Sequence, residues 1–142
     1  MHWVRKINVE NELIENMSVE RKLKVFLIED ASRIRSILID VLQRTGRIEV
    51  IGFAEGECDA LNQLRTIEWD VAIVDIRLNE GSGLGVLAGL KDDLKSYGKR
   101  LVFTNSPSPD LRVRSMALGA DDFFDKSKDL DMLVCCLQAM LD

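Results

Sequence analysis

Short apolar runs alternate along the chain with longer segments of helical periodicity. Five runs rich in β-branched and aromatic residues have the length of strands, at positions 24–28, 48–53, 71–74, 101–104 and 122–124. After each run, apolar residues recur every three to four positions, which is the period of an amphipathic helix. These helical stripes cover positions 34–42, 61–64, 84–94, 111–118 and 130–141, and the first places Ile34, Ile37, Leu38, Val41 and Leu42 on one apolar face. The pattern therefore predicts successive strand–helix units.

Strands that alternate with helices form right-handed βαβ units and a mostly parallel sheet. The first, third and fourth runs are almost continuously apolar, as expected of strands that are covered on both faces. We predict an α/β fold over residues 23–142, a doubly wound (βα)5 domain with a five-stranded parallel sheet and helices on both faces.

Residues 1–22 lie outside this pattern and are interpreted as an N-terminal extension. Val9, Leu13 and Met17 are spaced four apart, so the segment has the pattern of a short amphipathic helix. Three interpretations stay open for it: a frayed terminus, a helix packed on the domain, or an arm for self-association into a homodimer or for partner docking.

Composition excludes several classes of protein. A length of 142 residues suits one compact domain, and a net charge of −5 argues against direct binding of nucleic acid. No apolar run reaches the roughly 20 residues that span a membrane, and the N-terminus contains acidic residues and lacks the apolar core of a secretory signal. The three cysteines, Cys58, Cys135 and Cys136, have no metal-ligand spacing and indicate reduced, packed thiols. We therefore expect a cytoplasmic protein.

Polar residues stand where the predicted strands end. Glu29 and Asp30 follow the first run, and Asp75 follows the third. Thr104 ends the fourth run, and Lys126 comes shortly after the fifth. Ligands of open parallel sheets bind at the carboxyl ends of the strands. Three carboxylates, a hydroxyl and an ammonium group are therefore expected at one edge of the fold.

This combination favours phosphoryl chemistry. Neighbouring carboxylates raise one another's pKa, and a divalent cation with oxygen ligands removes that cost. Few protein ligands and room for water suit Mg²⁺. An aspartate beside Mg²⁺ and a lysine can attack phosphorus and form an acyl phosphate. Each residue alone would be an ordinary cap, loop residue or surface charge, so the prediction depends on their joint occurrence.

The segments KVFLIED, VAIVDIRLNEGSGLGVL, LVFTNSP and ALGADDFFDKS resemble, in this order and spacing, the receiver domains of two-component response regulators. That family has the CheY-like (flavodoxin-like) fold, and the resemblance covers residues 23–142. It implies that Asp75 accepts a phosphoryl group from a histidine kinase or a histidine phosphotransfer protein. It also implies Mg²⁺, bound by Asp30 and Asp75, by Glu29 through water, and by the backbone carbonyl of Arg77.

The resemblance assigns further roles. Thr104 takes the place of the switch hydroxyl that bonds the phosphoryl group, and Phe123 takes the place of the switch aromatic. Lys126 corresponds to the lysine that pairs first with the acceptor and then with the phosphoryl group. Two glycines also match the family pattern, Gly83 after the acceptor loop and Gly119 in the GAD element.

The sequence departs from the family at three positions. Asn79 and Ser127 stand where proline is usual, and Asn105 stands where a small residue usually follows the switch hydroxyl. Without proline, the Lys126–Ser127 bond is either trans or a cis bond that costs about 2.5–4 kcal/mol. These changes bear on reaction rate and switching, whereas the acidic, hydroxyl and basic groups of the site are all present.

The expected function is signalling rather than enzymatic. Phosphorylation would alter the surface of the fourth helix, fifth strand and fifth helix and so change contacts with a downstream protein partner. The chain is either a stand-alone receiver or a fragment whose output domain lies beyond Asp142. A phosphorylation-independent interaction module is the alternative that Asn79 and Ser127 motivate.

Two enzymatic or cofactor-binding alternatives are weaker. A phosphatase-type hydrolase would need a general acid near position 77, where Arg77 stands. A flavin-binding protein would need a phosphate-binding loop where Glu29 and Asp30 stand. The cognate kinase, the output partner and the pathway are not specified by these residues.

Overall fold

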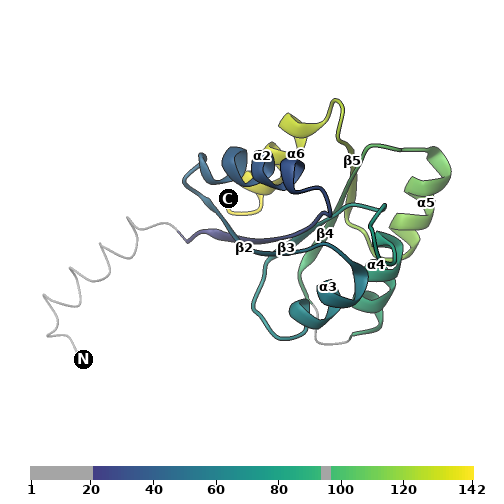
Figure 1. The fold of residues 1–142 in the computed structure, drawn as a ribbon. Coiled ribbons are helices and arrows are strands. Elements are labelled where there is room, and N and C mark those ends of the chain that lie inside the picture. Colours follow the sequence, from purple (N-terminus) through teal and green to yellow (C-terminus); the bar gives the residue numbers. More distant parts are fainter. Residues whose placement is uncertain (1–20, 94–96) are drawn as a thin grey trace, which may run out of the picture.

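Five parallel strands form one sheet in the computed structural model, which describes residues 21–93 and 97–142 (Figure 1). The spatial order is β2-β1-β3-β4-β5. The strands are β1 (Leu23–Ile28), β2 (Ile48–Ala54), β3 (Val71–Val74), β4 (Lys99–Thr104) and β5 (Asp122–Asp125). The predicted parallel sheet is therefore confirmed. The segment considered as a short helix around positions 9–17 lies outside the described residues, as does Leu94 at the end of the third stripe.

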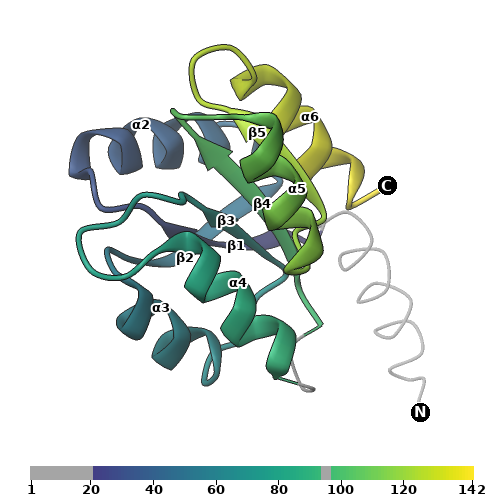
Figure 2. The ribbon, with the colours of Figure 1, turned by 90° about the vertical axis from the view of Figure 1, so that its right-hand side faces the viewer.

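Helices cover both faces of this sheet, as predicted (Figure 2). The described helices are α2 (Ser32–Gln43), α3 (Glu57–Leu64), α4 (Gly83–Asp92), α5 (Pro109–Ala117) and α6 (Leu130–Ala139). Helices α2 and α6 lie on one face, and α3, α4 and α5 lie on the other. None of the helices in the described part of the chain has the length and apolar character needed to cross a membrane.

Each face of the sheet has its own apolar core, and β1 contributes to both. Val25 and Leu27 pack on the side of α2 and α6, whereas Phe26 and Ile28 pack on the side of α3 and α4. Successive side chains of a strand point to opposite faces, so a strand covered on both sides must be apolar at every position. This explains the continuous apolar runs in the sequence.

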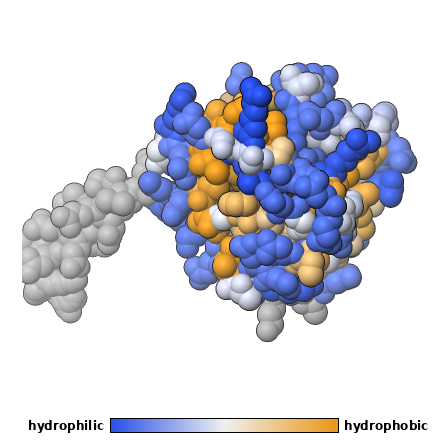
Figure 3. Space-filling view, viewed as in Figure 1, coloured by the Kyte–Doolittle hydropathy of each residue, from blue (hydrophilic) through white to orange (hydrophobic). Residues whose placement is uncertain are grey.

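Helix α2 differs in detail from the predicted stripe. Arg35, Leu38 and Leu42 are its buried residues, while Ile37 is 48% exposed. The prediction that Ile37 belongs to the buried face is therefore wrong. In the view of Figure 3, hydrophobic side chains gather around α2 on a surface that is otherwise mostly hydrophilic. Isolated exposed apolar side chains such as Ile37 are common.

The strand order places the predicted site residues together. Ile28 pairs with Val74, so the residues that follow β1 and β3 are neighbours. The Lys126 amide donates to the Thr104 carbonyl at 2.9 Å, which joins the ends of β4 and β5. The chain runs outward in both directions from β1 and β3, and ligand sites of open α/β sheets lie at such a reversal.

Two glycines have conformations that their positions require. A Cβ atom at Gly83 would lie 2.2 Å from the Asp75 carbonyl oxygen, so only glycine allows α4 to begin this close to β3. Gly119 has a φ of +100°, in the region that favours glycine. Both are the glycines that matched the family pattern.

The cysteines are only partly as expected. All three are free thiols. Cys136 packs against the core, and burial raises the pKa of its thiol. Cys58 and Cys135 are exposed, so the expectation of packed thiols is wrong for these two. Cys135 and Cys136 differ in exposure because neighbouring residues point to different sides of a helix.

Candidate functional site

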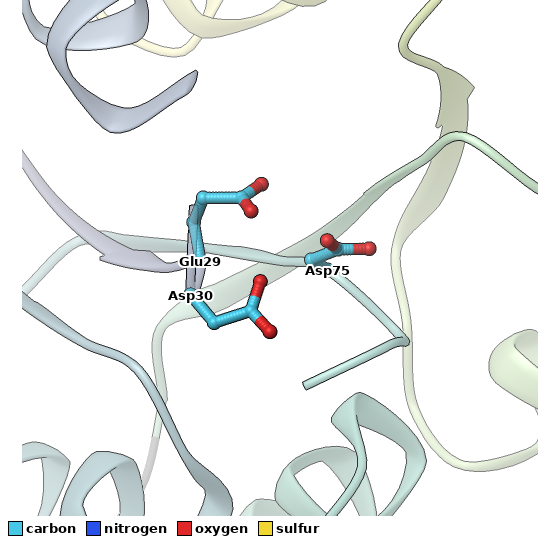
Figure 4. A group of neighbouring side chains, drawn as sticks. All are labelled: Glu29, Asp30 and Asp75. Carbon is cyan, nitrogen blue, oxygen red and sulfur yellow. The ribbon is translucent and has the colours of Figure 1, made fainter. Parts of the chain in front are cut away.

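Three carboxylates converge at the carboxyl edge of the sheet (Figure 4). One oxygen from each of Glu29, Asp30 and Asp75 lies within 4.8 Å of the others. Glu29 and Asp30 follow β1 directly, and Asp75 follows β3 directly, so the parallel register sets their spacing. Glu29 and Asp75 are buried, whereas Asp30 is half-buried. The arrangement matches the cluster expected from the strand ends.

Lys126 lies between two of these carboxylates. Its Nζ donates to Asp75 Oδ2 at 2.8 Å and also donates to Glu29 Oε1. The Lys126 side chain is 7% exposed. Burial lowers the pKa of Lys126, but the hydrogen bonds to Asp75 and Glu29 outweigh burial and leave that pKa above its ordinary value. The ammonium is therefore charged at neutral pH and offsets part of the acidic charge.

Hydrogen bonds hold both the side chain and the backbone of Glu29. Its Oε2 accepts from the Ala31 amide at 3.1 Å, and its backbone carbonyl accepts from Arg35 Nη1 at 2.7 Å. Burial raises the pKa of the Glu29 carboxyl, against the lowering effect of the bonds from Lys126 and Ala31. Both carboxylate oxygens of Glu29 already accept hydrogen bonds, which favours a supporting role for this residue.

Arg35 is a site residue that the sequence analysis missed. It is 8% exposed, forms an ion pair with Glu55 at 2.8 Å, and stacks on the Phe53 ring at 4.1 Å from the centroid. Together with its bond to the Glu29 carbonyl, these contacts tie the ends of β1 and β2 to α2. Its position three residues before buried Leu38 is a signal that could have identified it, because residues three apart share one helix face.

Thr104 and Asn105 complete the pocket. Thr104 is 1% exposed, and its Oγ1 accepts from the Ser106 amide at 3.3 Å. Asn105 is exposed at the rim. The pocket has a volume of about 240 Å³ and contains every acidic, hydroxyl and basic residue singled out above. Its lining is Glu29, Asp30, Ala31, Ile34, Asp75, Arg77, Thr104, Asn105, Ser106 and Lys126.

The turn after β5 is organised without proline. The Lys126–Ser127 bond is trans, as are the other peptide bonds in the described ranges. Asp125 Oδ1 accepts from the Ser127 amide at 2.8 Å and from Ser127 Oγ at 2.7 Å. The Asp125 amide in turn donates to Asp129 Oδ2 at 2.9 Å. These bonds fix the turn, and Lys126 reaches Asp75 despite the departure from the family pattern.

Phe123 is buried in the core layer that faces α3, α4 and α5, with 8% of its surface exposed. The Arg112 guanidinium of α5 lies 5.9 Å from the centroid of the Phe123 ring. The aromatic side chain therefore connects β5 to α5, and in the strand register Phe123 pairs with Val102, two residues before Thr104.

A larger hollow lies away from this cluster. It has a volume of about 900 Å³ and includes Trp69 and Asp70, which precede β3, and Tyr97, which precedes β4. It therefore lies at the amino ends of the strands. None of the strand-end residues singled out above lines it. Size alone is therefore a poor guide to the site in this molecule.

Comparison with known proteins places the chain in a family. A family model described as the response regulator receiver domain matches residues 25–138. A protein-glutamate methylesterase/protein-glutamine glutaminase of Methanospirillum hungatei is 30% identical over 110 residues, which are 76% of this chain and 32% of that protein. The Clostridium acetobutylicum protein of the same name is 32% identical over 107 residues, 74% of this chain and 31% of its own. The chain thus spans about a third of the length of these relatives.

Solved structures agree on the fold. The response regulator domain of Thermotoga maritima CheB has a TM-score of 0.73 at 19% identity, covering 85% of this chain and 94% of that one. The phosphorylated cyanobacterial phytochrome response regulator RcpA has a TM-score of 0.72 at 23% identity, covering 84% and 91%. The family match, the parallel sheet and the acidic edge agree, and the chain belongs to the response regulator receiver domain family of two-component systems.

Proposed function

We propose that this receiver domain accepts a phosphoryl group on Asp75 from a phosphohistidine of a histidine kinase or histidine phosphotransfer protein. The observation that carries the proposal is the bond from Lys126 Nζ to Asp75 Oδ2 inside a pocket that also holds Glu29, Asp30 and Thr104. The bond from Lys126 orients the carboxylate of Asp75, the group that would attack phosphorus.

In the proposed reaction, a carboxylate oxygen of Asp75 forms a bond to phosphorus while the bond from phosphorus to the donor imidazole nitrogen breaks. The leaving imidazole keeps the electron pair and takes up a proton. Lys126 then pairs with the new phosphoryl oxygens, and the nearby Thr104 hydroxyl donates to one of them. Such transfer depends mainly on positioning and on charge neutralisation.

The carboxylates fit a divalent cation. The three carboxylates share one bonded ammonium, that of Lys126, and one oxygen from each carboxylate lies within 4.8 Å of the others. Asp30, Asp75 and the Arg77 carbonyl would hold Mg²⁺, with Glu29 contacting it through water because both oxygens of Glu29 accept protein hydrogen bonds. Bound Mg²⁺ would supply positive charge next to the phosphoryl oxygens.

Signal output is proposed to pass through Thr104 and Phe123. A phosphoryl dianion draws the Thr104 hydroxyl toward it, and Phe123 adjusts in the space beside α5. The surface of α5, β5 and α6 then changes its preference for a downstream partner or for an output domain in a longer chain. A protein phosphodonor would meet the pocket beside α2, where Ile34 lines it.

The remaining assignments belong to the same proposal. Residues 23–142 form the receiver domain and residues 1–22 its extension. The domain acts in the cytoplasm and has no enzymatic activity beyond its own phosphorylation and dephosphorylation. The methylesterase or glutaminase activity named for the longer relatives is not assigned to this chain, which matches about a third of their length.

The test uses Mg²⁺ and acetyl phosphate, followed by intact-mass measurement of wild type and Asp75→Asn. We expect wild type to gain the mass of one phosphoryl group and Asp75→Asn to gain none. No gain in wild type, or equal gains in both, would contradict the proposal. Binding of a partner that is the same with and without beryllofluoride and Mg²⁺ would favour the phosphorylation-independent module instead.

A further inference from the structure

The loop that follows Asp75 is attached to the start of α3. This loop, residues 76–82, carries Arg77 along one wall of the acidic pocket. Gly56 and Glu80 form a parallel bridge, and the Glu57 amide donates to the Glu80 carbonyl at 3.0 Å. Two segments more than 20 residues apart in the sequence are thus joined beside the acceptor.

Two glutamates make this attachment reciprocal. Glu57 Oε1, on α3, accepts from the Ser82 amide of the loop at 3.0 Å. Glu80 Oε1, on the loop, accepts from the Cys58 amide of α3 at 3.1 Å. The N-cap of α3 is Gly56, which has no side chain to cap the helix. Glu80 therefore satisfies an amide at the helix start, where negative charge is also favoured.

The Glu57 contact acts on the residue that closes the loop. Ser82 caps α4 by accepting from the Leu84 amide at 3.0 Å, and its hydroxyl donates to the Ile76 carbonyl at 3.3 Å. The Gly83 amide donates to the same carbonyl at 2.9 Å. A carboxylate that holds Ser82 thus limits the movement of the loop between Ile76 and Ser82.

Space for the Glu57 carboxylate is provided by Gly85. A Cβ atom at position 85 would lie 2.2 Å from Glu57 Oε1 and 2.4 Å from Glu57 Oε2, closer than real contacts allow. The loop also contains Asn79 at the position where the family usually has proline. Proline would limit backbone freedom directly, whereas here contacts from α3 limit it.

We propose that Glu57 is a positioning residue for the metal site, because it holds the loop whose Arg77 carbonyl would be the third protein ligand. The inference rests on the proposed function and names a residue outside the acidic pocket. Residues that orient metal ligands typically change metal affinity by about 10- to 100-fold when they are removed.

Mg²⁺ binding to the purified protein, without phosphodonor, tests this directly. An NMR titration would compare wild type with Glu57→Ala, Glu57→Gln and Asp59→Asn. We expect Glu57→Ala to weaken Mg²⁺ binding about tenfold, since it orients a ligand without contacting the ion. Glu57→Gln keeps an oxygen that can accept from Ser82 and should bind Mg²⁺ nearly as wild type does. Asp59→Asn is the matched control, because Asp59 lies on α3 with the same charge and bonds Gln63 instead of the loop.

Phosphorylation at increasing Mg²⁺ separates positioning from general damage. For Glu57→Ala, we expect the Mg²⁺ concentration at half-maximal rate to rise about tenfold, in line with its affinity, while the maximal rate is unchanged. Loss of folded protein would lower the maximal rate and leave the half-saturation point where it was. That outcome would overturn the inference, as would equal Mg²⁺ affinities of Glu57→Ala and wild type. Wild type that fails to bind Mg²⁺ would instead contradict the proposed function.

A substitution on α4, at Gly85, tests the same Glu57 contact independently. Gly85→Ala puts a methyl group where the Glu57 carboxylate lies, so it should weaken Mg²⁺ binding as Glu57→Ala does. In the Glu57→Ala background the same change should have no further effect, because the carboxylate is already absent. Additive effects of the two substitutions on Mg²⁺ affinity would show that they act independently and would contradict the inference.

Discussion

The carboxyl and amino ends of the strands both carry ion pairs, but the two edges of the sheet expose them differently. At the carboxyl edge, Lys126 and Asp75 are 2.8 Å apart with side chains 7% and 9% exposed. At the amino edge, Arg21 and Asp70 are 2.7 Å apart with side chains 65% and 24% exposed. The nitrogen–oxygen distances of the two ion pairs are nearly equal, so the pairs differ mainly in their exposure to water. Water screens an exposed pair, whereas a buried charge depends on its partner.

This comparison also separates the pocket that bears chemistry from the larger hollow. The acidic pocket is about 240 Å³ and the hollow at the amino ends is about 900 Å³. Among the described lining residues, buried charges held by hydrogen bonds occur in the smaller pocket, at Glu29, Asp75 and Lys126. Each of these charges costs free energy to bury, so their presence at one edge indicates a functional demand on that edge.

The largest expected effect comes from removing the buried cation. Lys126→Met leaves Glu29 and Asp75 without their shared partner and should lower the free energy of unfolding by about 3 kcal/mol. Lys24→Met breaks the exposed pair with Glu68 at the other edge and should cost less than about 1 kcal/mol. Urea unfolding at pH 7 without divalent cations measures both. Equal losses would show that burial does not distinguish the two edges.

A smaller difference is expected for two arginines. Arg35→Ala removes the donor to the buried Glu29 carbonyl and should cost about 1–3 kcal/mol of unfolding free energy. Arg21→Ala breaks the exposed pair with Asp70 and should cost less than about 1 kcal/mol. Urea unfolding again gives both values. A cost for Arg21→Ala as large as that for Arg35→Ala would contradict the contrast between the edges.

The smallest effect concerns the exposed turn that holds Lys126. Hydrogen bonds from the Ser127 amide and hydroxyl hold the pKa of Asp125 below its ordinary value. A lowered pKa in the folded state adds stability above the unfolded value of 3.8, and this is lost as pH falls through the folded pKa. Ser127→Ala should raise the Asp125 pKa toward its ordinary value. The free energy of unfolding should then depend less on pH below about pH 4. NMR titration of the Asp125 carboxyl measures this, with Ser127→Thr as the control that keeps the hydroxyl. An unchanged Asp125 pKa in Ser127→Ala would show that the hydroxyl bond contributes nothing.

Local pattern was enough to predict much of the fold and the residues at the strand ends. The spacing of apolar residues in a strand or helix reflects which side of that element faces the core. In a parallel sheet the carboxyl ends of the strands meet, so residues such as Asp30 and Asp75 lie at one edge. Helix α2 shows the limit of this reasoning. Its apolar stripe predicted a buried Ile37, but the helix instead buries Arg35, whose guanidinium finds partners on two other elements.

The pattern of residues along the chain was sufficient to predict the alternation of strands and helices, the parallel sheet and the acidic, hydroxyl and basic residues at its carboxyl edge. The contacts that position these residues became visible in the three-dimensional fold. Lys126 bonds Glu29 across 97 residues, and Glu57 bonds Ser82 across 25. The trans turn of Asp125 and Ser127 also takes the place of the usual proline. These outcomes depend on distances between segments far apart in the chain, which no local period or propensity contains.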